Sequence, residues 1–385
     1  MSAGAKSFFI RSDKLGRAQC EHCCTPLDVS EFRVFERVEC PECGKRTTVP
    51  GQLGDYILLH ELGRGGMGAV FLAKDTRLGR KVALKILNSV YGENPEFIDA
   101  LLQEAKATAA LNHQNIVHIF SFGQVYQQPY FVMELVEGIR LDECIGAKVE
   151  PDEAGWLELM AQVVDGLANA QSQGLIHGDV KPANMLMDAR GVVKISDFGI
   201  ARFGESGPSD TIFGTPMYIA PEKARGKAYD HRSDQYSLGT SFWHLITGRP
   251  PFVGKTSKAV VFNRFEKPPP DLREVMPNLS DPFAELILKT MAMNPEERFA
   301  DFYALKAEIV RLQTAGLSET FAQETLQDVS LTGIETQPLT TVAGENSSSK
   351  AFAETRSPGR DKILLRVLWG GVAAGFALIF WMLLR

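Results

Sequence analysis

The sequence predicts an α+β chain in which strands come first and helices follow, with a small cysteine-containing segment in front and an apolar segment at the end. Three observations predict this order. A glycine-rich turn near residue 65 lies between strand-like runs, an apolar stripe with helical spacing follows near residue 100, and a largely apolar helix runs from about residue 234 to Ile246. The net charge of −6 argues against a nucleic-acid partner.

The first fifty residues contain two Cys-x-x-Cys pairs with a strand-like stretch, 32–38, between them. The four cysteines are Cys20, Cys23, Cys40 and Cys43. Two such turns at this separation can present four thiolates to one tetrahedral zinc ion, and they resemble zinc-ribbon knuckles. A redox dithiol and inert core cysteines are the alternatives, and the nearby donors His22 and Cys24 leave the ligands of the first turn open. We expect residues 15–50 to form a zinc-ribbon-like module with a structural Zn²⁺.

A glycine-rich turn, 63–68, reads Gly-Arg-Gly-Gly-Met-Gly. Glycines let the backbone approach phosphates without a Cβ in the way. Dinucleotide-binding folds use the same spacing between a strand and a helix, but here residues 71–73 and 82–87 both read as strands. This placement in a β-hairpin favours a turn that covers a triphosphate.

Lys85 and Ala83 are two residues apart in the second of these strands and therefore share a face, which we expect to line a cleft. In the helix predicted after Pro95, one face carries Phe97, Leu101, Glu104, Thr108 and Leu111. A carboxylate on such an apolar face needs a cationic partner. We expect Glu104 to pair with Lys85, the alternative being that Lys85 is an ordinary solvated lysine.

The interval 177–199 carries the groups that phosphoryl transfer requires. It reads His-Gly-Asp-Val-Lys-Pro-Ala-Asn at 177–184 and Asp-Phe-Gly at 197–199. Transfer of a phosphoryl group needs an oriented hydroxyl, metal ions on the phosphates and positive charge on the migrating group. Two aspartates, one asparagine and one lysine at this spacing can supply these parts.

Taken in order, these motifs resemble those of protein kinases over residues 56–312, and their style is most similar to bacterial kinases of the eukaryotic type. The resemblance implies a two-lobed protein kinase fold, with a small β-rich lobe and a large helical lobe. It also implies transfer of the γ-phosphate of ATP, with Mg²⁺ or Mn²⁺, to Ser/Thr hydroxyls of protein substrates. The turn 214–218, Gly-Thr-Pro-x-Tyr, is typical of Ser/Thr rather than tyrosine kinases.

The resemblance assigns roles to individual residues. Asp179 would orient the substrate hydroxyl, Lys181 would steady the γ-phosphate, and Thr215 would hydrogen-bond both. The magnesium ligands would be Asn184 and Asp197. Lys85, positioned by Glu104, would hold the α- and β-phosphates. The residues expected around the nucleotide are Leu62, Gly63, Gly65, Gly68, Val70, Ala83, Lys85, Glu104, Met133, Glu134, Val136 and Leu186.

Three further residues are given structural roles by the same resemblance. Asp234 would lie at the start of the buried helix of the large lobe, and Glu222 of an Ala-Pro-Glu motif would pair with Arg298. In this interpretation none of the three takes part in the chemistry.

Gly178 departs from the family pattern, because most members carry arginine there. That arginine neutralises phosphate on the activation segment. We therefore expect phosphorylation at Ser206, Ser209 or Thr211 not to be the main switch. The alternative function is a catalytically inactive, nucleotide-binding membrane scaffold that docks partners through the zinc ribbon.

Residues 313–362 are rich in Ser, Thr, Gln and Gly and are expected to form a flexible linker, which is either a site of autophosphorylation or a plain spacer. Residues 363–385 are expected to form a transmembrane helix, because 367–384 contain no charge. Basic residues crowd its N-terminal flank, which predicts a single-pass protein of the inner cell membrane with a cytoplasmic kinase domain. Gly371-x-x-x-Gly375 would allow a homodimer. A buried globular helix is the alternative.

Overall fold

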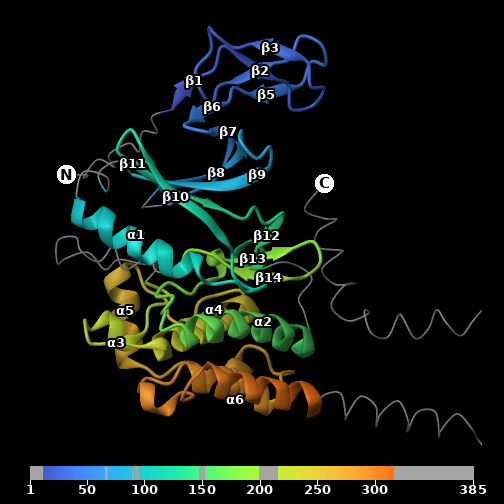
Figure 1. Ribbon diagram of the computed structural model, residues 1–385. Coiled ribbons are helices and arrows are strands. Elements are labelled where there is room, and N and C mark those ends of the chain that lie inside the picture. The colour runs from blue at the N-terminus through green and yellow to red at the C-terminus, as the bar shows by residue number, and fades with distance from the viewer. Residues whose placement is uncertain are drawn as a thin grey trace, which may run out of the picture.

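The structure, a computed structural model, describes residues 12–65, 68–88, 91, 95–146, 152–198 and 216–315. Figure 1 shows a strand-rich lobe above a helical lobe, with the cysteine module beyond the far edge of the strands. The two-lobed α+β arrangement predicted from the sequence is confirmed. No helix within the described ranges is both long and apolar enough to cross a membrane. The predicted transmembrane segment, 363–385, lies outside those ranges.

The cysteine module consists of two short hairpins. Strand β2 (Arg17–Gln19) pairs with β3 (Pro26–Asp28), and β4 (Arg37–Glu39) pairs with β5 (Arg46–Thr48). Its small core contains Cys20, Leu27, Val29, Val38, Cys40 and Val49. The prediction of a strand over 32–38 was wrong for most of that stretch, because only its last two residues belong to β4. The rest is a turn that carries Phe35 out of the module.

The sheet of the small lobe has seven strands in the order β1-β6-β7-β8-β9-β11-β10. Its strands are β1 (Asp13–Lys14), β6 (Gly51–Leu53), β7 (Tyr56–Gly65), β8 (Gly68–Asp75), β9 (Lys81–Leu87), β10 (Ile119–Val125) and β11 (Gln128–Met133). All neighbours pair antiparallel. The predicted hairpin is confirmed, since β7 and β8 flank the glycine-rich turn and pair at Gly65 and Gly68.

The two faces of this sheet carry separate apolar clusters. Helix α1 (Pro95–Ala109) packs through Leu101 and Ala105 into a cluster that includes Ala83, Phe131 and Met133. The members of the other cluster include Leu53, Leu58, Phe71, Leu84 and Val132. The strand period of two separates these sets, because successive side chains point to opposite faces.

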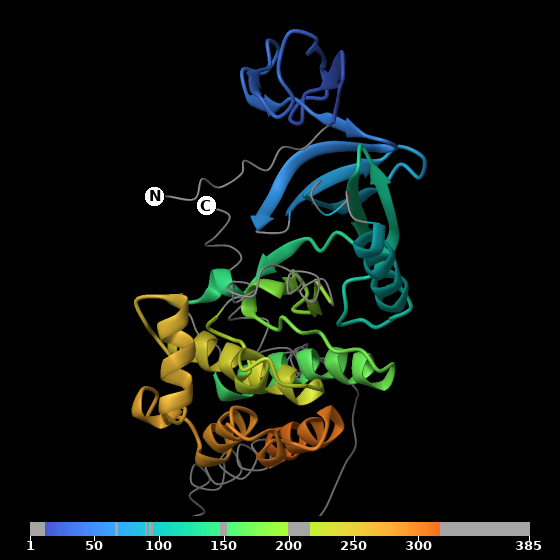
Figure 2. The same cartoon turned by 90° about the vertical axis from the view of Figure 1, so that its left-hand side faces the viewer.

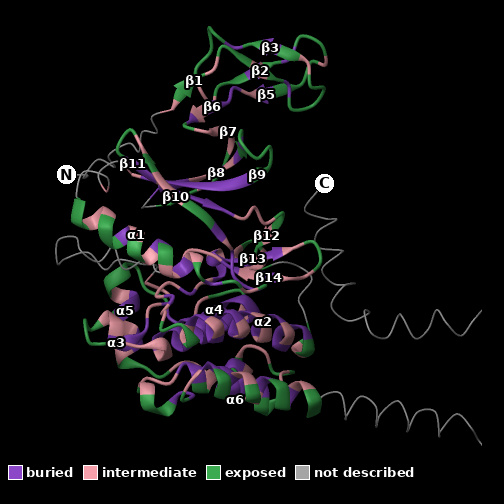
Figure 3. Cartoon of the chain, viewed as in Figure 1, coloured by how far each residue is buried: buried purple, intermediate pink, exposed green. Residues whose placement is uncertain are grey.

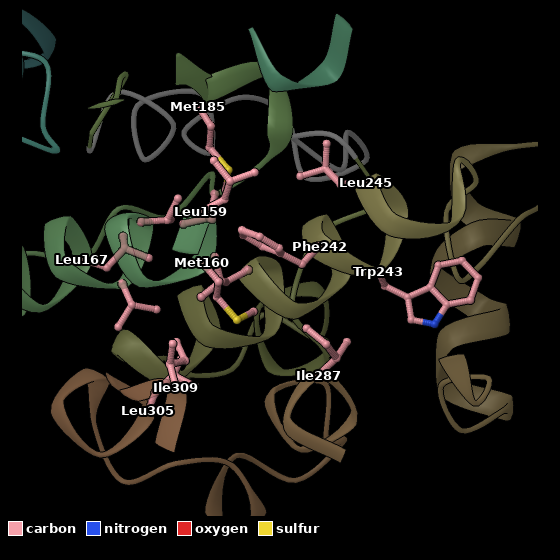
Figure 4. Close-up of a cluster of buried hydrophobic side chains, with 14 of the residues drawn as sticks. Leu159, Met160, Leu167, Met185, Phe242, Trp243, Leu245, Ile287, Leu305 and Ile309 are labelled. Carbon is pink, nitrogen blue, oxygen red and sulfur yellow. The ribbon is translucent and has the colours of Figure 1, made fainter. Parts of the chain in front are cut away.

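The helical lobe is built around two long helices, α2 (Glu153–Ser172) and α4 (His231–Thr247). Figure 4 shows Leu159, Met160 and Leu167 of α2 meeting Phe242 of α4 in one apolar cluster. Figure 3 shows how deeply these helices are buried. Helix α4 ends at Thr247, and Gly248, with a φ of +71°, provides a left-handed cap.

Shorter elements complete the lobe. The helices are α3 (Pro221–Ala224), α5 (Ser257–Glu266) and α6 (Asp281–Thr290), with short 3₁₀ turns at η2 (Leu141–Cys144), η3 (Pro182–Asn184), η5 (Leu272–Glu274) and η6 (Pro295–Glu297). A three-stranded sheet, β12 (Gly138–Arg140), β13 (Met185–Asp188) and β14 (Val193–Ile195), lies between the lobes (Figure 1). A last helix runs through residues 302–315 and so extends three residues into the predicted linker.

Candidate active site

The loop 177–184 is anchored from below by Asp234, in the first turn of α4. The backbone N–H groups of His177 and Gly178 donate to its two carboxylate oxygens at 2.7 and 2.8 Å. Burial raises the pKa of the Asp234 carboxyl, while His177 and the two amide donors act against that shift. A buried carboxylate that accepts two backbone hydrogen bonds fixes the direction in which the chain enters the loop.

Asp179, Lys181 and Asn184 are brought together on this anchored loop. Lys181 Nζ lies 2.5 Å from Asp179 Oδ2. Asn184 Nδ2 donates to the carbonyl oxygen of Asp179 at 2.9 Å and to its Oδ2 at 3.2 Å. These bonds occupy the amide nitrogen of Asn184, so its amide oxygen is the group that could bind a metal ion.

Lys85 reaches across the cleft to Asp197, with Nζ and Oδ1 2.8 Å apart. Asp197 has a φ of +66°, a backbone conformation that non-glycine residues rarely adopt. Burial by itself raises the pKa of Asp197, but the charge and hydrogen bond of Lys85, together with His177 and Lys181, outweigh burial and lower that pKa below its usual range. The pair places a cation and a potential metal ligand from the two lobes side by side.

The structure does not bring Lys85 to Glu104. The expected helix face is present, since Leu101 and Thr108 are buried on it and Glu104 is half-buried. Within the described residues, however, Lys85 forms its ion pair with Asp197 and none with Glu104. In this part of the chain the lysine is thus neutralised by Asp197, and Glu104 remains half-buried without an ion pair to it.

The residues predicted around the adenine gather in one place. The apolar cluster on the α1 side of the sheet includes Ala83 and Met133, with Val70, Val136 and Leu186 packed against it. Strand register sets Val70 opposite both Gly63 and Lys85. Leu62 is largely exposed, and the described glycines of the turn are Gly63, Gly65 and Gly68.

Glu134, the residue after strand β11, directs its side chain away from this cluster. Its carboxylate pairs with Lys194 at 3.0 Å, and its backbone N–H donates to the carbonyl of His118 at 2.9 Å. The carbonyl of Glu134 is therefore the backbone group left to bind adenine at that residue.

Gly178 is held from both sides. Its φ is +79°, its N–H is bound by Asp234, and Lys223 Nζ donates to its carbonyl at 2.9 Å. A Cβ built on Gly178 would lie 3.6 Å from Lys223 Nζ. The ammonium group thus occupies the space next to the position where most protein kinases carry arginine. Lys223 was not predicted from the sequence, although its place directly after Ala-Pro-Glu was the available signal.

The base of the large lobe contains the predicted pair of Glu222 and Arg298, which is confirmed at 2.7 Å. Burial raises the pKa of Glu222, but bonding to Arg298 outweighs it and lowers that pKa. A second buried arginine, Arg264 of α5, was not predicted, and it donates to the carbonyls of Pro216 and Met217 at 2.9 and 2.7 Å. Arg264 thus holds the described part of the turn 214–218, and Arg298 holds Glu222 just after it.

Several predicted residues lie outside the described ranges. They are Thr215 and the candidate phosphorylation sites Ser206, Ser209 and Thr211. The roles given to them stay predictions.

The four cysteines predicted as zinc ligands converge, with all Sγ atoms within 4.8 Å of one another. Cys20 and Cys43 have sulfurs 3.8 Å apart, and those of Cys23 and Cys40 are 3.6 Å apart. A tetrahedral ion with Zn–S bonds of about 2.3 Å would require sulfurs about 3.8 Å apart, so this donor set fits zinc. The cluster could hold such an ion.

The two open donors of the first turn are placed elsewhere. His22 uses its ring Nε2 with the carbonyl of Arg46 at 3.1 Å, while its backbone N–H points to Cys20 Sγ at 3.4 Å. Cys24 is exposed, and its φ of +61° matches that of Gly44, +67°, in the second turn. Both residues therefore serve the turn geometry in the described arrangement.

Comparison with known proteins agrees with this site. The profile described as "Protein kinase domain" matches residues 56–310. The chain is 35% identical over 327 residues to the serine/threonine-protein kinase PknB of Mycobacterium tuberculosis. The match covers 82% of this chain and 52% of PknB. It is 33% identical over 338 residues to PrkC of Bacillus subtilis, covering 84% of this chain and 52% of PrkC. The chain thus spans about half the length of these curated relatives.

A solved structure shows the same fold. The kinase domain of Mycobacterium tuberculosis PknI superimposes with a TM-score of 0.55 at 27% identity, covering 68% of this chain and 97% of that domain. With a matched profile over most of its length and relatives above 30% identity, this chain belongs to the protein kinase family.

Proposed function

We propose that this protein is a membrane-tethered serine/threonine protein kinase that transfers the γ-phosphate of ATP to Ser/Thr hydroxyls of proteins. The observation that carries the proposal is the meeting of Asp179, Lys181 and Asn184 on one anchored loop, with Lys85 and Asp197 paired at 2.8 Å in the cleft. These are the cationic, carboxylate and amide groups that in-line phosphoryl transfer requires.

The reaction assigns each side chain a task. Asp179 orients the substrate hydroxyl and accepts its proton while the hydroxyl oxygen bonds to the γ-phosphorus and the bond to the β-phosphate oxygen breaks. Lys181 balances charge on the migrating group, and Lys85 binds the α- and β-phosphates. Magnesium or manganese held by Asn184 and Asp197 would supply further positive charge to the phosphates. Phosphates entering the cleft would compete with Asp197 for Lys85 and so release that carboxylate for the metal.

The test is γ-phosphate transfer from ATP to the chain itself and to a generic basic protein. We expect Asp179→Asn to lower kcat by about 10²–10⁴-fold, because a positioned base contributes that much. Asp197→Ala should abolish transfer. Asp99→Asn removes an exposed carboxylate on α1 and serves as the charge-matched control. Transfer that persists in both active-site variants would refute the assignment.

A catalytically inactive scaffold that binds nucleotide is the second candidate. It is favoured by Gly178 in place of arginine and by the lack of an ion pair between Lys85 and Glu104 among the described residues. Nucleotide binding does not separate the two functions, but turnover does. Well-folded protein that binds ATP and transfers no phosphate would support the scaffold.

The anchoring of Gly178 supports an activity that does not depend on phosphorylation of the activation segment. Asp234 and Lys223 hold this residue on its N–H and its carbonyl without any phosphate. Replacement of Ser206, Ser209 and Thr211 together by alanine should leave most of the activity. Loss of activity from the folded triple variant would contradict this idea.

The membrane tether rests on the uncharged run 367–384 and on the basic residues that precede it. These features support a single-pass placement in the inner cell membrane with the kinase in the cytoplasm. Deletion of 363–385 should move the protein from the membrane fraction to the soluble fraction. Gly371→Ile should weaken self-association in a membrane reporter assay if the small-residue spacing forms a homodimer.

We also propose that the cysteine cluster binds a structural zinc ion, as the sulfur geometry permits. Metal analysis of the purified protein should find one zinc per chain. Absence of zinc from protein prepared without chelators would contradict this proposal.

A further inference from the structure

The cysteine module is joined to the small lobe through the sheet itself. Strands β1 and β6, which flank the module in the sequence, are the last two strands at one edge of the seven-stranded sheet. Strand β6 pairs with β7, with Gly51 opposite Leu58 and Leu53 opposite Tyr56. Tyr126 of the β10–β11 turn donates to Asp13 of β1 at 2.5 Å. Figures 1 and 2 both show the module directly beyond the strands that carry the glycine-rich turn.

A second contact is made by Phe35, whose ring packs on the small lobe. Its ring stacks on that of Phe71, with centroids 5.1 Å apart and planes inclined by 22°. Phe71 is fully buried in the outer cluster of the sheet, and Phe35 is packed against that same cluster. Stacked aromatic pairs of this kind add stability beyond the area they bury.

Phe35 holds an unfavourable backbone conformation to make this contact. Its φ is +66°, which is rare for a bulky side chain. Hydrogen bonds of 2.8 Å from Phe35 N to Val49 O and from Val49 N to Glu36 O tie its turn to the core of the module. Val49 packs in that core beside Cys20 and Cys40. The turn therefore depends on the same small core as the cysteine cluster.

Phe71 in turn is adjacent to the nucleotide site. Its neighbour Val70 lies opposite Gly63 and Lys85 and packs in the cluster on the α1 side. Because successive residues of a strand face opposite sides, Phe71 supports strand β8 from behind while Val70 faces the cleft. A side chain that fixes Phe71 thus fixes the strand on which the glycine-rich turn is built.

We propose that the zinc module is a working part of the nucleotide-binding lobe, and that Phe35 is a positioning residue through which metal binding sets the affinity for ATP. This inference rests on the zinc site and kinase activity proposed above. With metal bound, the turn 32–36 presses Phe35 onto Phe71 and the glycine-rich hairpin is held in its binding shape. Without metal the turn relaxes and the hairpin is less ordered. Part of the binding free energy of ATP is then used to order the hairpin, so ATP binds more weakly.

The experiment uses the full-length chain in mild detergent and measures zinc content, KM for ATP and kcat. Phe35→Ala should retain zinc and raise KM for ATP roughly three- to tenfold with little change in kcat, as expected for loss of one stacked pair. Cys40→Ser should lose zinc and raise KM at least as much. Phe32→Ala, an exposed aromatic in the same turn, is the matched control and should change neither quantity.

The outcomes separate this inference from those on which it rests. Phe35→Ala with normal zinc and an unchanged KM would overturn the coupling while leaving the zinc site and the kinase intact. Absence of zinc in the wild-type protein would overturn the proposed dependence on metal. Absence of turnover would refute the proposed kinase activity, and the coupling would then be measured as the affinity for ATP. If Cys40→Ser does not fold, a zinc-selective chelator that spares magnesium is applied to wild type. An unchanged ATP affinity after zinc removal would then refute the proposal.

Discussion

The cysteine turns and the catalytic loop both gather polar groups at close range, but they are held by different means. The cysteine turns close locally, with the N–H groups of Cys24 and Gly44 donating to the carbonyls of Cys20 and Cys40, each at 2.9 Å. The loop at Gly178 is held by Asp234 and Lys223, 56 and 45 residues away. A site that is closed by local hydrogen bonds can be predicted from the spacing of its residues. For a site held by distant residues, the sequence indicates the catalytic side chains but not the residues that hold the loop.

Removal of the long-range support should have the largest effect. Asp234→Ala leaves two buried N–H groups without acceptors, and we expect it to cost about 3–5 kcal/mol of unfolding free energy. Activity of the remaining folded protein should fall by more than about 100-fold, since misplacement of a catalytic group by 1 Å can cost that much. Urea denaturation and kcat measure the two effects.

The control for this variant is Asp230→Asn at the start of the same helix. Asp230 caps α4 through the N–H of Arg232, and asparagine caps a helix about as well. It should therefore change neither quantity by much. An equal loss in both variants would show that removal of negative charge at the start of α4, rather than loss of the loop anchor, explains the effect.

Lys223→Met tests the other support of Gly178 and should have a smaller effect. It removes a charge-assisted hydrogen bond to the Gly178 carbonyl, which is worth about 1.5–3 kcal/mol, and we expect kcat to fall roughly tenfold with KM for ATP unchanged. Lys227→Met, an exposed lysine just beyond α3, is the matched control. Unchanged kcat in Lys223→Met would mean that Asp234 alone orients the loop.

Acid should separate the two regions. The pKa of Asp197 is lowered from the usual 3.8, so its pairing with Lys85 is fully present above that value and is lost only as pH falls through the lowered pKa. Zinc-bound thiolates take up protons at a higher pH than the Asp197 carboxylate does. On acidification the module should therefore release its metal before the pair of Asp197 and Lys85 is lost. A metal-release assay and NMR titration of the carboxylates measure the order.

The variant Lys85→Met sharpens this comparison. It should raise the pKa of Asp197, because burial then acts without the opposing charge. Metal release from the cysteine module should be unchanged. An Asp197 titration that does not move would show that the ion pair does not set its pKa.

The smallest expected effect concerns the matched turns of the cysteine module. Cys24 has a φ of +61° where the second turn has Gly44 at +67°. Cys24→Gly should therefore stabilise the module by about 0.5–1 kcal/mol, because glycine adopts this conformation without strain, and zinc should be retained. Thermal unfolding and metal analysis provide the measurement. Loss of zinc would instead identify Cys24 as a ligand.

What the sequence determined by itself was local. Backbone preferences within a few residues decide the shape of the cysteine turns, the glycine-rich hairpin and the cap of α4 at Gly248. The residues that meet at the catalytic loop were also predictable, because Asp179, Lys181 and Asn184 lie within six positions.

The tertiary structure decided which distant partner each of these groups finds. Lys85 was expected to pair with Glu104, but it pairs with Asp197, because a buried cation goes to the carboxylate that folding brings nearest. Phe35 was expected within a strand, but it lies in a turn and packs on Phe71 of the small lobe. Lys223 and Arg264 bind backbone carbonyls 45 and 48 residues away in the chain, and no local pattern names those partners. Local spacing specifies the chemistry, whereas long-range packing specifies what holds it in place.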